Sequence, residues 1–304
     1  MSKRVLITGA SGLVGTKLTE ILLEMDYDVS HLGRSKTSKK SIKSYIWDID
    51  KGFIEDGALE NANIVVHLAG AGVADERWTN KRKQKILNSR VQSTSLLYRK
   101  LALLNASCEA VIAASAIGIY GLNTGDTWLH EGAPSGDGFL AMVTKQWEQE
   151  ITRLEELNLR VVTLRTGIAL SEKGGALPKI TQSIGLNMGA VLGSGDQYMS
   201  WIHLDDLCTL FVKAIEDLDV RGVFNAVAPN PVTNREFTMT LARVMDKRIW
   251  LPSVPGMVLK SLLGELATVV LGGNRVSPNK IQSFGFHFQF EELEPALEDI
   301  IIKK

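Results

Sequence analysis

The stretch "TGASGLVG" (residues 8–15) has the residue types and spacing that can hold a dinucleotide. Its glycines follow the apolar run "RVLI" and open an amphipathic segment. The first glycine permits a tight turn, the second lets backbone approach a pyrophosphate at a helix N-terminus, and the third lets helix and strand pack closely. Since a strand precedes and a helix follows, a glycine turn without a ligand is the weaker interpretation. The contacts predicted here are Thr8, Gly9, Ser11, Gly12, Leu13, Val14 and Gly15.

The end of the second expected strand, "YDVSHLGRS" (residues 27–35), distinguishes between two nicotinamide dinucleotides. A strand end with Asp or Glu binds the ribose hydroxyls of NAD, whereas a nearby arginine accommodates the 2′-phosphate of NADP. Arg34 and Ser35 stand at this end, and Asp28 lies at the strand's beginning. Because a guanidinium can hold a phosphate in a bidentate fork, the sequence favours NADP(H) over NAD(H). A solvated loop arginine is the alternative.

Two further strand ends fit a dinucleotide. Asp48 closes "YIWD", where its carboxylate could accept a hydrogen bond from the adenine amine. The segment "HLAGAG" (residues 67–72) ends an apolar run in small residues, so Leu68, Ala69 and Gly70 would let a ribose or an adenine come close. An ordinary strand-end turn is the alternative at both places.

Alternating apolar runs and helical patterns must position these residues. We expect strands at residues 4–8, 27–33, 44–50, 63–70, 108–115 and 160–167, and helices at 12–25, 80–104 and 139–157. Such alternation predicts βαβ units and a Rossmann-like, doubly wound α/β fold with a parallel sheet. Ligands bind at the carboxyl ends of the strands in such sheets.

The regular alternation ends near Gly167. The following residues, 171–203, are rich in glycine and polar turn formers. A helix at 204–218 and a strand at 222–229 are expected next, and the tail is mainly helical. We therefore expect an NAD(P)-binding domain over residues 1–230 and a small, mainly helical, substrate-side C-terminal lobe over residues 231–304.

The composition is that of a globular protein without a charged partner. Hydrophobic residues make up 45% of the chain, and 34 basic residues balance 34 acidic ones. The basic run "TNKRKQK" (residues 79–85) is interpreted as a solvated helix face, not as a nucleic-acid site. Cys108 and Cys208 lack the spacing of a disulfide framework or a metal site. With no apolar run of about 18 residues, we expect a soluble, cytoplasmic protein without a membrane partner. The sequence has no metal-ligand cluster, so we expect no metal either.

The motifs "TGASGLVG", "HLAG", "SAIGIYG" (residues 115–121), "LRTG" (164–167) and "WIHLDDL" (201–207) together resemble the extended short-chain dehydrogenase/reductase superfamily. "ERWT", "GSGDQYMSWIH", "FNAVAPNPVTNREF" and "GGNRVSPNKIQSFGF" are similar to its sugar-nucleotide epimerase, or cell-division-inhibitor-like, subgroup, which has a characteristic C-terminal domain. The resemblance covers nearly the whole chain. It implies an NAD(P)-dependent oxidoreductase or epimerase and places Thr166 beside the cofactor.

The same resemblance implies a serine, a tyrosine and a lysine at the reacting group. Ser115 matches the serine, and Lys145 matches the lysine that binds the nicotinamide ribose. That lysine also lowers the pKa of the tyrosine, a phenol that otherwise titrates near about 10. Ala141 stands where the tyrosine belongs. The segment from Ser115 to Tyr120 is one residue longer than usual, and a solvated lysine is the alternative for Lys145.

No other residue is singled out as the proton donor. Nearby candidates are Tyr120, Asp126, His130, Glu131, Tyr198 and His203. Two hypotheses follow. The chain is an NADP(H)-dependent oxidoreductase or epimerase-like enzyme acting on a small or nucleotide-linked substrate, or it is a non-catalytic, dinucleotide-binding regulatory or redox-sensing protein. By analogy with the superfamily, the helices at 80–104 and 139–157 would pair two chains in a homodimer.

Overall fold

The central feature of the fold is an eight-stranded sheet. The computed structural model describes residues 3–36, 42–104 and 107–302. Across the sheet the strand order is β12, β8, β6, β5, β1, β2, β3, β4, and all neighbours pair in parallel except β3 and β4. The strands span Arg4–Thr8 (β1), Asp28–Gly33 (β2), Lys43–Asp48 (β3), Phe53–Ile54 (β4), Ile64–His67 (β5), Ala110–Ala116 (β6), Arg160–Thr166 (β8) and Gly222–Ala226 (β12).

The direction of strand addition reverses beside β1. The chain adds β2 and β3 on one side of β1 and then returns to place β5 on the other side. Every residue of β5 is buried, as expected for a strand covered on both faces. The doubly wound α/β fold predicted from the sequence is therefore confirmed. The crevice at such a reversal, outside the carboxyl ends of the strands, is where ligands bind in these folds.

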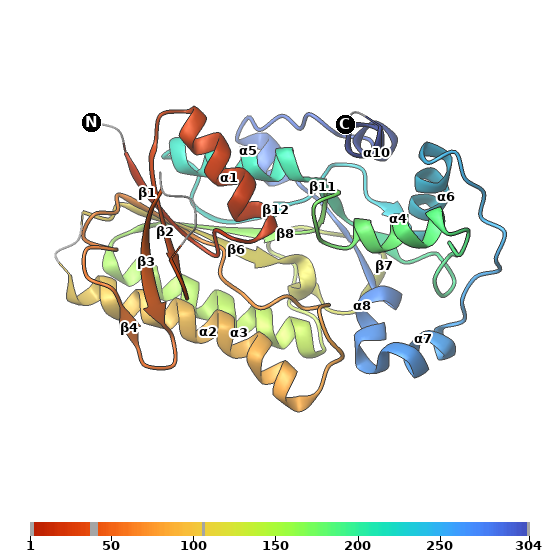
Figure 1. Ribbon diagram of the computed structural model, residues 1–304, viewed down its shortest axis with the longest axis horizontal. Coiled ribbons are helices and arrows are strands. Elements are labelled where there is room, and N and C mark those ends of the chain that lie inside the picture. The colour runs from red at the N-terminus through yellow and green to blue at the C-terminus, as the bar shows by residue number, and fades with distance from the viewer. Residues whose placement is uncertain (1–2, 37–41, 105–106, 303–304) are drawn as a thin grey trace.

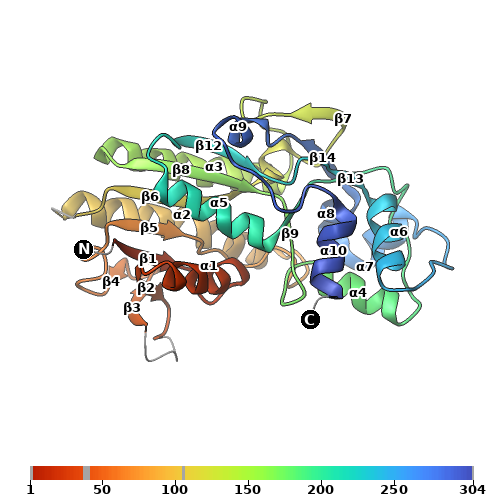
Figure 2. The ribbon, with the colours of Figure 1, turned by 90° about the horizontal axis from the view of Figure 1, so that it is seen from above.

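Helices cover both faces of the sheet. The helices α1 (Leu13–Glu24) and α5 (Leu204–Glu216) pack on one face around a core that includes Leu18 and Phe211. The helices α2 (Asn80–Leu103) and α3 (Phe139–Arg153) pack side by side on the other face (Figures 1 and 2). The 3₁₀ turn η2 (Leu154–Leu157) continues α3. The homodimer expected through α2 and α3 stays a prediction.

The segment that follows β6 contains a strand that the sequence analysis did not predict. A 3₁₀ turn, η1 (Ile117–Tyr120), leads from β6 into β7 (Asn123–Leu129). This strand pairs in parallel with β14 (Gly273–Val276), so the tail is not purely helical. Residues of β7 are mostly polar and exposed, which hides the strand from pattern analysis. The pairing brings the C-terminal part of the chain onto the turn that follows β6.

A smaller lobe forms beyond the carboxyl ends of the strands (Figure 2). Its core joins Leu170 and Leu177 to Phe237, Leu241 and Leu297, so it combines residues from both sides of position 230. Its elements are β9 (Ile168–Leu170), α4 (Leu177–Gly185), β10 (Tyr198–Met199), β11 (Trp201–His203), β13 (Val232–Thr233), α6 (Asn234–Val244) and α10 (Leu293–Ile301). The remaining elements are α7 (Gly256–Leu263), η3 (Gly264–Leu266), α8 (Ala267–Leu271) and α9 (Asn279–Ser283). The domain boundary at residue 230 stays a prediction.

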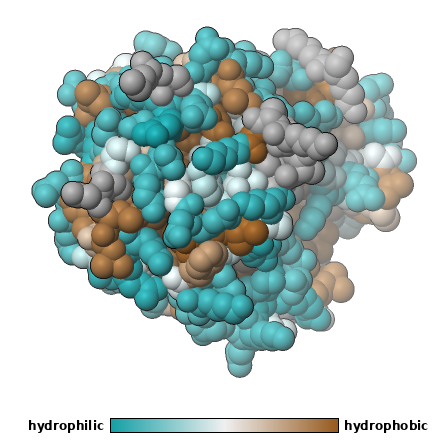
Figure 3. Space-filling model, turned by 60° about the vertical axis from the view of Figure 1, so that its left-hand side comes forward, coloured by the Kyte–Doolittle hydropathy of each residue, from teal (hydrophilic) through white to brown (hydrophobic). Residues whose placement is uncertain are grey.

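The surface is mixed in character. On the face drawn in Figure 3, hydrophobic side chains occur in small groups among hydrophilic ones. Among the described residues, no helix has the length and apolar character needed to cross a membrane.

Candidate functional site

The turn between β1 and α1 has two positions at which only glycine fits. Gly9 has a φ of +68°, and a Cβ there would lie 2.8 Å from the carbonyl carbon of Leu68. A Cβ on Gly15 would lie 2.6 Å from the Cα of Ala10, so a side chain would force α1 away from the turn. Gly12 is the N-cap of α1 and borders an open cavity. The N-terminus of α1 can therefore receive a phosphate group at Gly12.

A buried polar chain fixes the wall opposite this turn. The Thr8 hydroxyl oxygen accepts hydrogen bonds from the backbone N–H groups of Leu68 and Ala69, at 3.1 and 3.2 Å. The same oxygen lies 2.8 Å from Nδ1 of His67, whose Nε2 lies 3.1 Å from the hydroxyl of Thr94. Burial lowers the pKa of His67 to about 4, so the imidazole is neutral near neutral pH. This chain of hydrogen bonds holds the end of β5 in place. The sequence analysis did not predict the roles of His67 and Thr94 in it.

A cavity of about 580 Å³ opens beside the glycine turn. It extends from the ends of β2 and β3 to the N-terminal turns of α2, and its size is in the range of ligand pockets. The predicted contacts that line it are Gly9, Ser11, Gly12, Arg34, Ser35, Leu68, Ala69 and Gly70. The structure thus brings the two predicted strand ends and the glycine turn together around one space.

Arg34 is the available cation at the end of β2. Its side chain is exposed on the cavity wall, and no hydrogen bond or ion pair joins it to the described part of the chain. The neighbouring Lys36 also lines the cavity, but its ammonium is 2.6 Å from the carboxylate of Glu55 and donates to the carbonyl of Ser44. Lys36 is therefore neutralised by the protein itself, whereas Arg34 can meet an external anion.

The other predicted contacts lie outside this cavity: Thr8, Leu13, Val14, Gly15, Asp48, Ser115, Lys145 and Thr166. The Asp48 carboxylate accepts a hydrogen bond from the backbone N–H of Lys51 and lies 3.5 Å from the ammonium of that residue. It thereby stabilises the turn between β3 and β4. Leu13 lines a second hollow of about 680 Å³, on the side of α1 that faces His203 and Asp299. In the described residues, no cluster of His, Cys, Asp and Glu could hold a metal ion.

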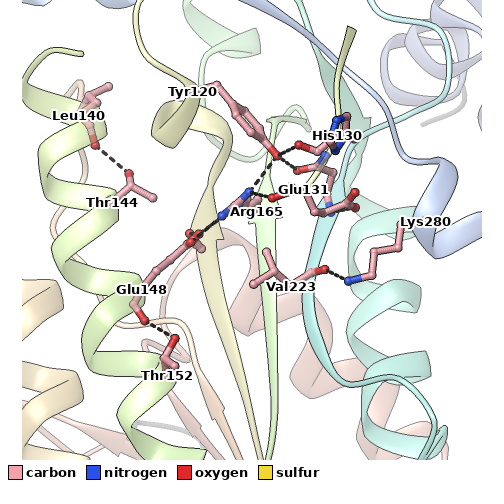
Figure 4. Close-up of polar contacts among 12 residues, drawn as sticks. Tyr120, His130, Glu131, Leu140, Thr144, Glu148, Thr152, Arg165, Val223 and Lys280 are labelled. Carbon is pink, nitrogen blue, oxygen red and sulfur yellow. Dashed lines mark hydrogen bonds and ion pairs between the residues drawn. The ribbon is translucent and has the colours of Figure 1, made fainter. Parts of the chain in front are cut away.

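Ser115 is buried, and its side chain points toward α3. Its hydroxyl donates a hydrogen bond of 2.5 Å to Glu148 of α3. The two carboxylate oxygens of Glu148 accept from Nε and Nη2 of Arg165, at 2.9 and 2.8 Å (Figure 4). Burial disfavours the charge on Arg165, but bonding and attraction to Glu148 outweigh it and raise the pKa of the guanidinium. Ser115 therefore belongs to a buried ion-pair network.

Tyr120 belongs to the same network. Its hydroxyl donates to Oδ1 of Asn225 at 2.7 Å and accepts from Nη1 of Arg165 at 3.0 Å (Figure 4). Glu131 also joins, because its carboxylate accepts from the backbone N–H of Asn225. Burial raises the pKa of Tyr120, which makes the phenol harder to ionise. These bonds support the turn after β6 and leave the Tyr120 hydroxyl engaged.

The face that α3 turns toward β6 and η1 carries Leu140, Thr144 and Glu148 (Figure 4). A Cβ on Gly118 would lie 3.4 Å from Cβ of Leu140 and 3.8 Å from the hydroxyl oxygen of Thr144. That hydroxyl donates to the carbonyl of Leu140. Ala141 is buried and Lys145 is exposed. The ribose-binding role of Lys145 stays a prediction.

A parallel sheet with a glycine turn and a cavity at its switch point defines the class of NAD(P)-binding Rossmann-like proteins. Residues 5–226 match the NAD dependent epimerase/dehydratase family, and residues 254–300 match a domain of unknown function, DUF1731. The chain belongs to the NAD dependent epimerase/dehydratase family. The resemblance to extended short-chain dehydrogenases, with a characteristic C-terminal domain, is confirmed.

Relatives match over the whole length. The chain is 34% identical to the epimerase family protein YfhF of Bacillus subtilis, covering 98% of this chain and 97% of that protein. The crystal structure of human epimerase family protein SDR39U1 (isoform 2) with NADPH superposes with a TM-score of 0.88 at 29% identity, covering 98% of each chain. A nucleoside-diphosphate sugar epimerase from Corynebacterium glutamicum superposes at 0.82 with 32% identity, covering all of this chain and 59% of the other.

Proposed function

We propose that this protein binds NADP(H) in the cavity beside the glycine turn and works as an oxidoreductase on a small-molecule substrate. The observation that carries the proposal is Arg34, a cation on the cavity wall at the end of β2 that pairs with none of the described residues. In this fold a ribose 2′-phosphate comes to the end of that strand. The cradle fits a dinucleotide, because Gly9 and Gly15 leave no room for side chains and Gly12 opens onto the cavity. The NADPH named with the human relative agrees with this choice.

The bound dinucleotide would supply the hydride chemistry, and the protein would orient it. Thr8 and His67 would hold the residues that border the dinucleotide, while the N-terminus of α1 would face its pyrophosphate. The last residue of β6 and the first two residues of η1 are Ala116, Ile117 and Gly118, which are half-buried, and none of them carries a hydroxyl. Because residue 141 is alanine, the proton donor in this proposal is not a phenol at that position. The proton comes from the substrate, from water or from another segment.

Binding measurements test the cofactor. Wild-type protein should bind NADPH at least about tenfold more tightly than NADH, since a hydrogen-bonded charge contributes roughly 1.5–3 kcal/mol. Arg34→Ala should remove most of that preference by weakening NADPH alone. Arg221→Ala is the matched control, because Arg221 is exposed and lies outside the cavity. Equal affinities of the wild type for both dinucleotides would refute the proposal.

A second candidate function is dinucleotide binding without turnover. It is favoured by the hydrogen bond that commits the Ser115 hydroxyl to Glu148. Hydride transfer from NADPH across a panel of carbonyl compounds separates the two candidates. Steady turnover of any member would exclude the binding-only function. Tight NADPH binding without turnover of any panel member would favour it over the oxidoreductase.

A further inference from the structure

The basic run at residues 79–85 is not a uniform solvated face. Thr79 is the N-cap of α2 and accepts a hydrogen bond from the backbone N–H of Arg82. The Lys83 ammonium pairs with Glu265 of η3. Lys81 and Lys85 are both exposed, one helical turn apart, but only Lys85 lines the dinucleotide cavity. Neither of these two lysines forms an ion pair or a hydrogen bond with the described residues.

Arg82 forms an ion pair with Asp75, an acidic residue on the wall of the same cavity. Its side chain is 4% exposed, and its guanidinium donates to the carboxylates of Asp75 and Glu76, at 3.0 and 3.1 Å, and to the carbonyl of Gly72. Asp75 lines the cavity beside Lys85. Because the Asp75 carboxylate is paired with Arg82, it does not neutralise the charge of Lys85.

The cavity therefore has two unpaired cations among its described lining residues. Arg34 comes from the end of β2, and Lys85 comes from the second turn of α2. Two other cations line the cavity but are already paired. Lys36 pairs with Glu55, and Arg82 pairs with Asp75 and Glu76. An anion within this space would be attracted from two elements that are separate in the sequence. A lysine ammonium is a flexible point charge that suits phosphate oxygens without requiring the fixed fork of an arginine.

We infer that Lys85 is a phosphate-binding residue of the dinucleotide cavity, with its ammonium donating to a phosphate oxygen of NADP(H). This inference rests on the proposed function, because it concerns the same cavity. The phosphate is either the 2′-phosphate, shared with Arg34, or the pyrophosphate at the glycine turn. The chemistry is the same in both cases, and the choice of ligand in the experiment distinguishes them.

The test compares Lys85→Ala with Lys81→Ala, its matched control on the same helix. Dissociation constants for NADPH, NADH, 2′-AMP and ADP are measured for both variants and for the wild type. Lys85→Ala should weaken NADPH by about fivefold to tenfold, while Lys81→Ala stays within about twofold. Contact with the 2′-phosphate predicts losses for NADPH and 2′-AMP only. Contact with the pyrophosphate predicts equal losses for NADPH and NADH, with a loss for ADP and none for 2′-AMP.

A second variant and the salt dependence strengthen the test. Lys85→Arg should keep most of the affinity, and Lys85→Ala should bind NADPH with a weaker dependence on salt concentration, because one ion contact is lost. If the wild type prefers NADPH but Lys85→Ala binds it like Lys81→Ala, the inference is overturned while the proposed function stands. If the wild type binds both dinucleotides equally, the NADP(H) proposal fails, and an equal loss for both in Lys85→Ala would still support Lys85. Absence of dinucleotide binding would overturn both.

Discussion

Ser115 and Glu148 share a hydrogen bond of 2.5 Å that ties β6 to α3. The carboxylate of Glu148 also binds Arg165 through two hydrogen bonds, and the two side chains are 12% and 9% exposed. Removing the partner of a mostly buried guanidinium lowers protein stability strongly, because it leaves a buried charge uncompensated. The serine matched to the catalytic position by sequence is thus held inside an ion-pair network.

Removing the carboxylate should destabilise the protein strongly. Glu148→Ala leaves Arg165 buried without its counter-ion, so the free energy of unfolding should fall by about 3–5 kcal/mol in urea denaturation. Glu150→Ala is the control, because Glu150 pairs with Arg153 three residues along the same helix and that pair is partly exposed. Its loss should be at most about 1 kcal/mol. Similar losses for the two variants would show that the Glu148–Arg165 pair contributes no more to stability than the partly exposed Glu150–Arg153 pair.

Ser115→Ala distinguishes a structural serine from a catalytic one. If the hydroxyl acts only through Glu148, the variant should lose about 1 kcal/mol of stability and bind NADPH within about twofold of the wild type. Turnover, where a substrate is found, should persist. Abolished turnover at wild-type stability and NADPH affinity would instead establish the catalytic role predicted from the sequence.

Alanine at two glycines separates backbone strain from lack of space. Gly9 and Gly52 both have positive φ values, +68° and +63°, but only at Gly9 would a Cβ approach another part of the backbone. Gly52→Ala should cost roughly 1–2 kcal/mol, the price of the left-handed conformation, and leave NADPH binding unchanged. Gly9→Ala should cost more and weaken NADPH binding at least tenfold, because Leu68 and Ala69 must move. Thermal unfolding and NADPH titration measure both effects.

Acid should destabilise the protein partly through His67. Its folded pKa, about 4, lies below the unfolded value of 6.5, so the unfolded chain binds more protons between these pH values. The His67 contribution is fully present above pH 6.5 and is lost as the pH falls toward 4. His203, whose pKa burial also lowers, acts in the same direction. The slope of unfolding free energy against pH should therefore be shallower in His67→Gln; an unchanged slope would contradict the assignment.

The sheet and the glycine-turn side of the cavity were predictable from the sequence because they depend on local patterns. The run at Ile64–His67 is continuous and apolar, as a strand buried on both faces requires. Arg34 could be found because it follows a strand whose position the glycine turn fixes. The strands β7 and β14 could not be found, since their pairing joins polar segments far apart in the chain.

The parts that sequence analysis missed depend on which way a side chain points. A strand alternates between faces at every residue, so spacing alone could not show that Ser115 faces α3. The basic run on α2 gave no signal that separates Lys81 from Lys85. Only the packing of α2 against the residues after β5 shows that Lys85 lines the cavity and that Lys81, equally exposed, does not.

The pairing of β7 with β14 has a consequence for synthesis of the protein. Thr124 and Asn274, bonded side chain to side chain in this region, are 150 residues apart. A nascent chain can complete its glycine turn and the strands around it long before Asn274 leaves the ribosome. Domains form from the N-terminus during translation, and contacts of long sequence separation form late. The segment after β6 therefore waits for the last stretch of the chain, so the glycine turn and the strands around it can form on the ribosome before β7 has its partner strand β14.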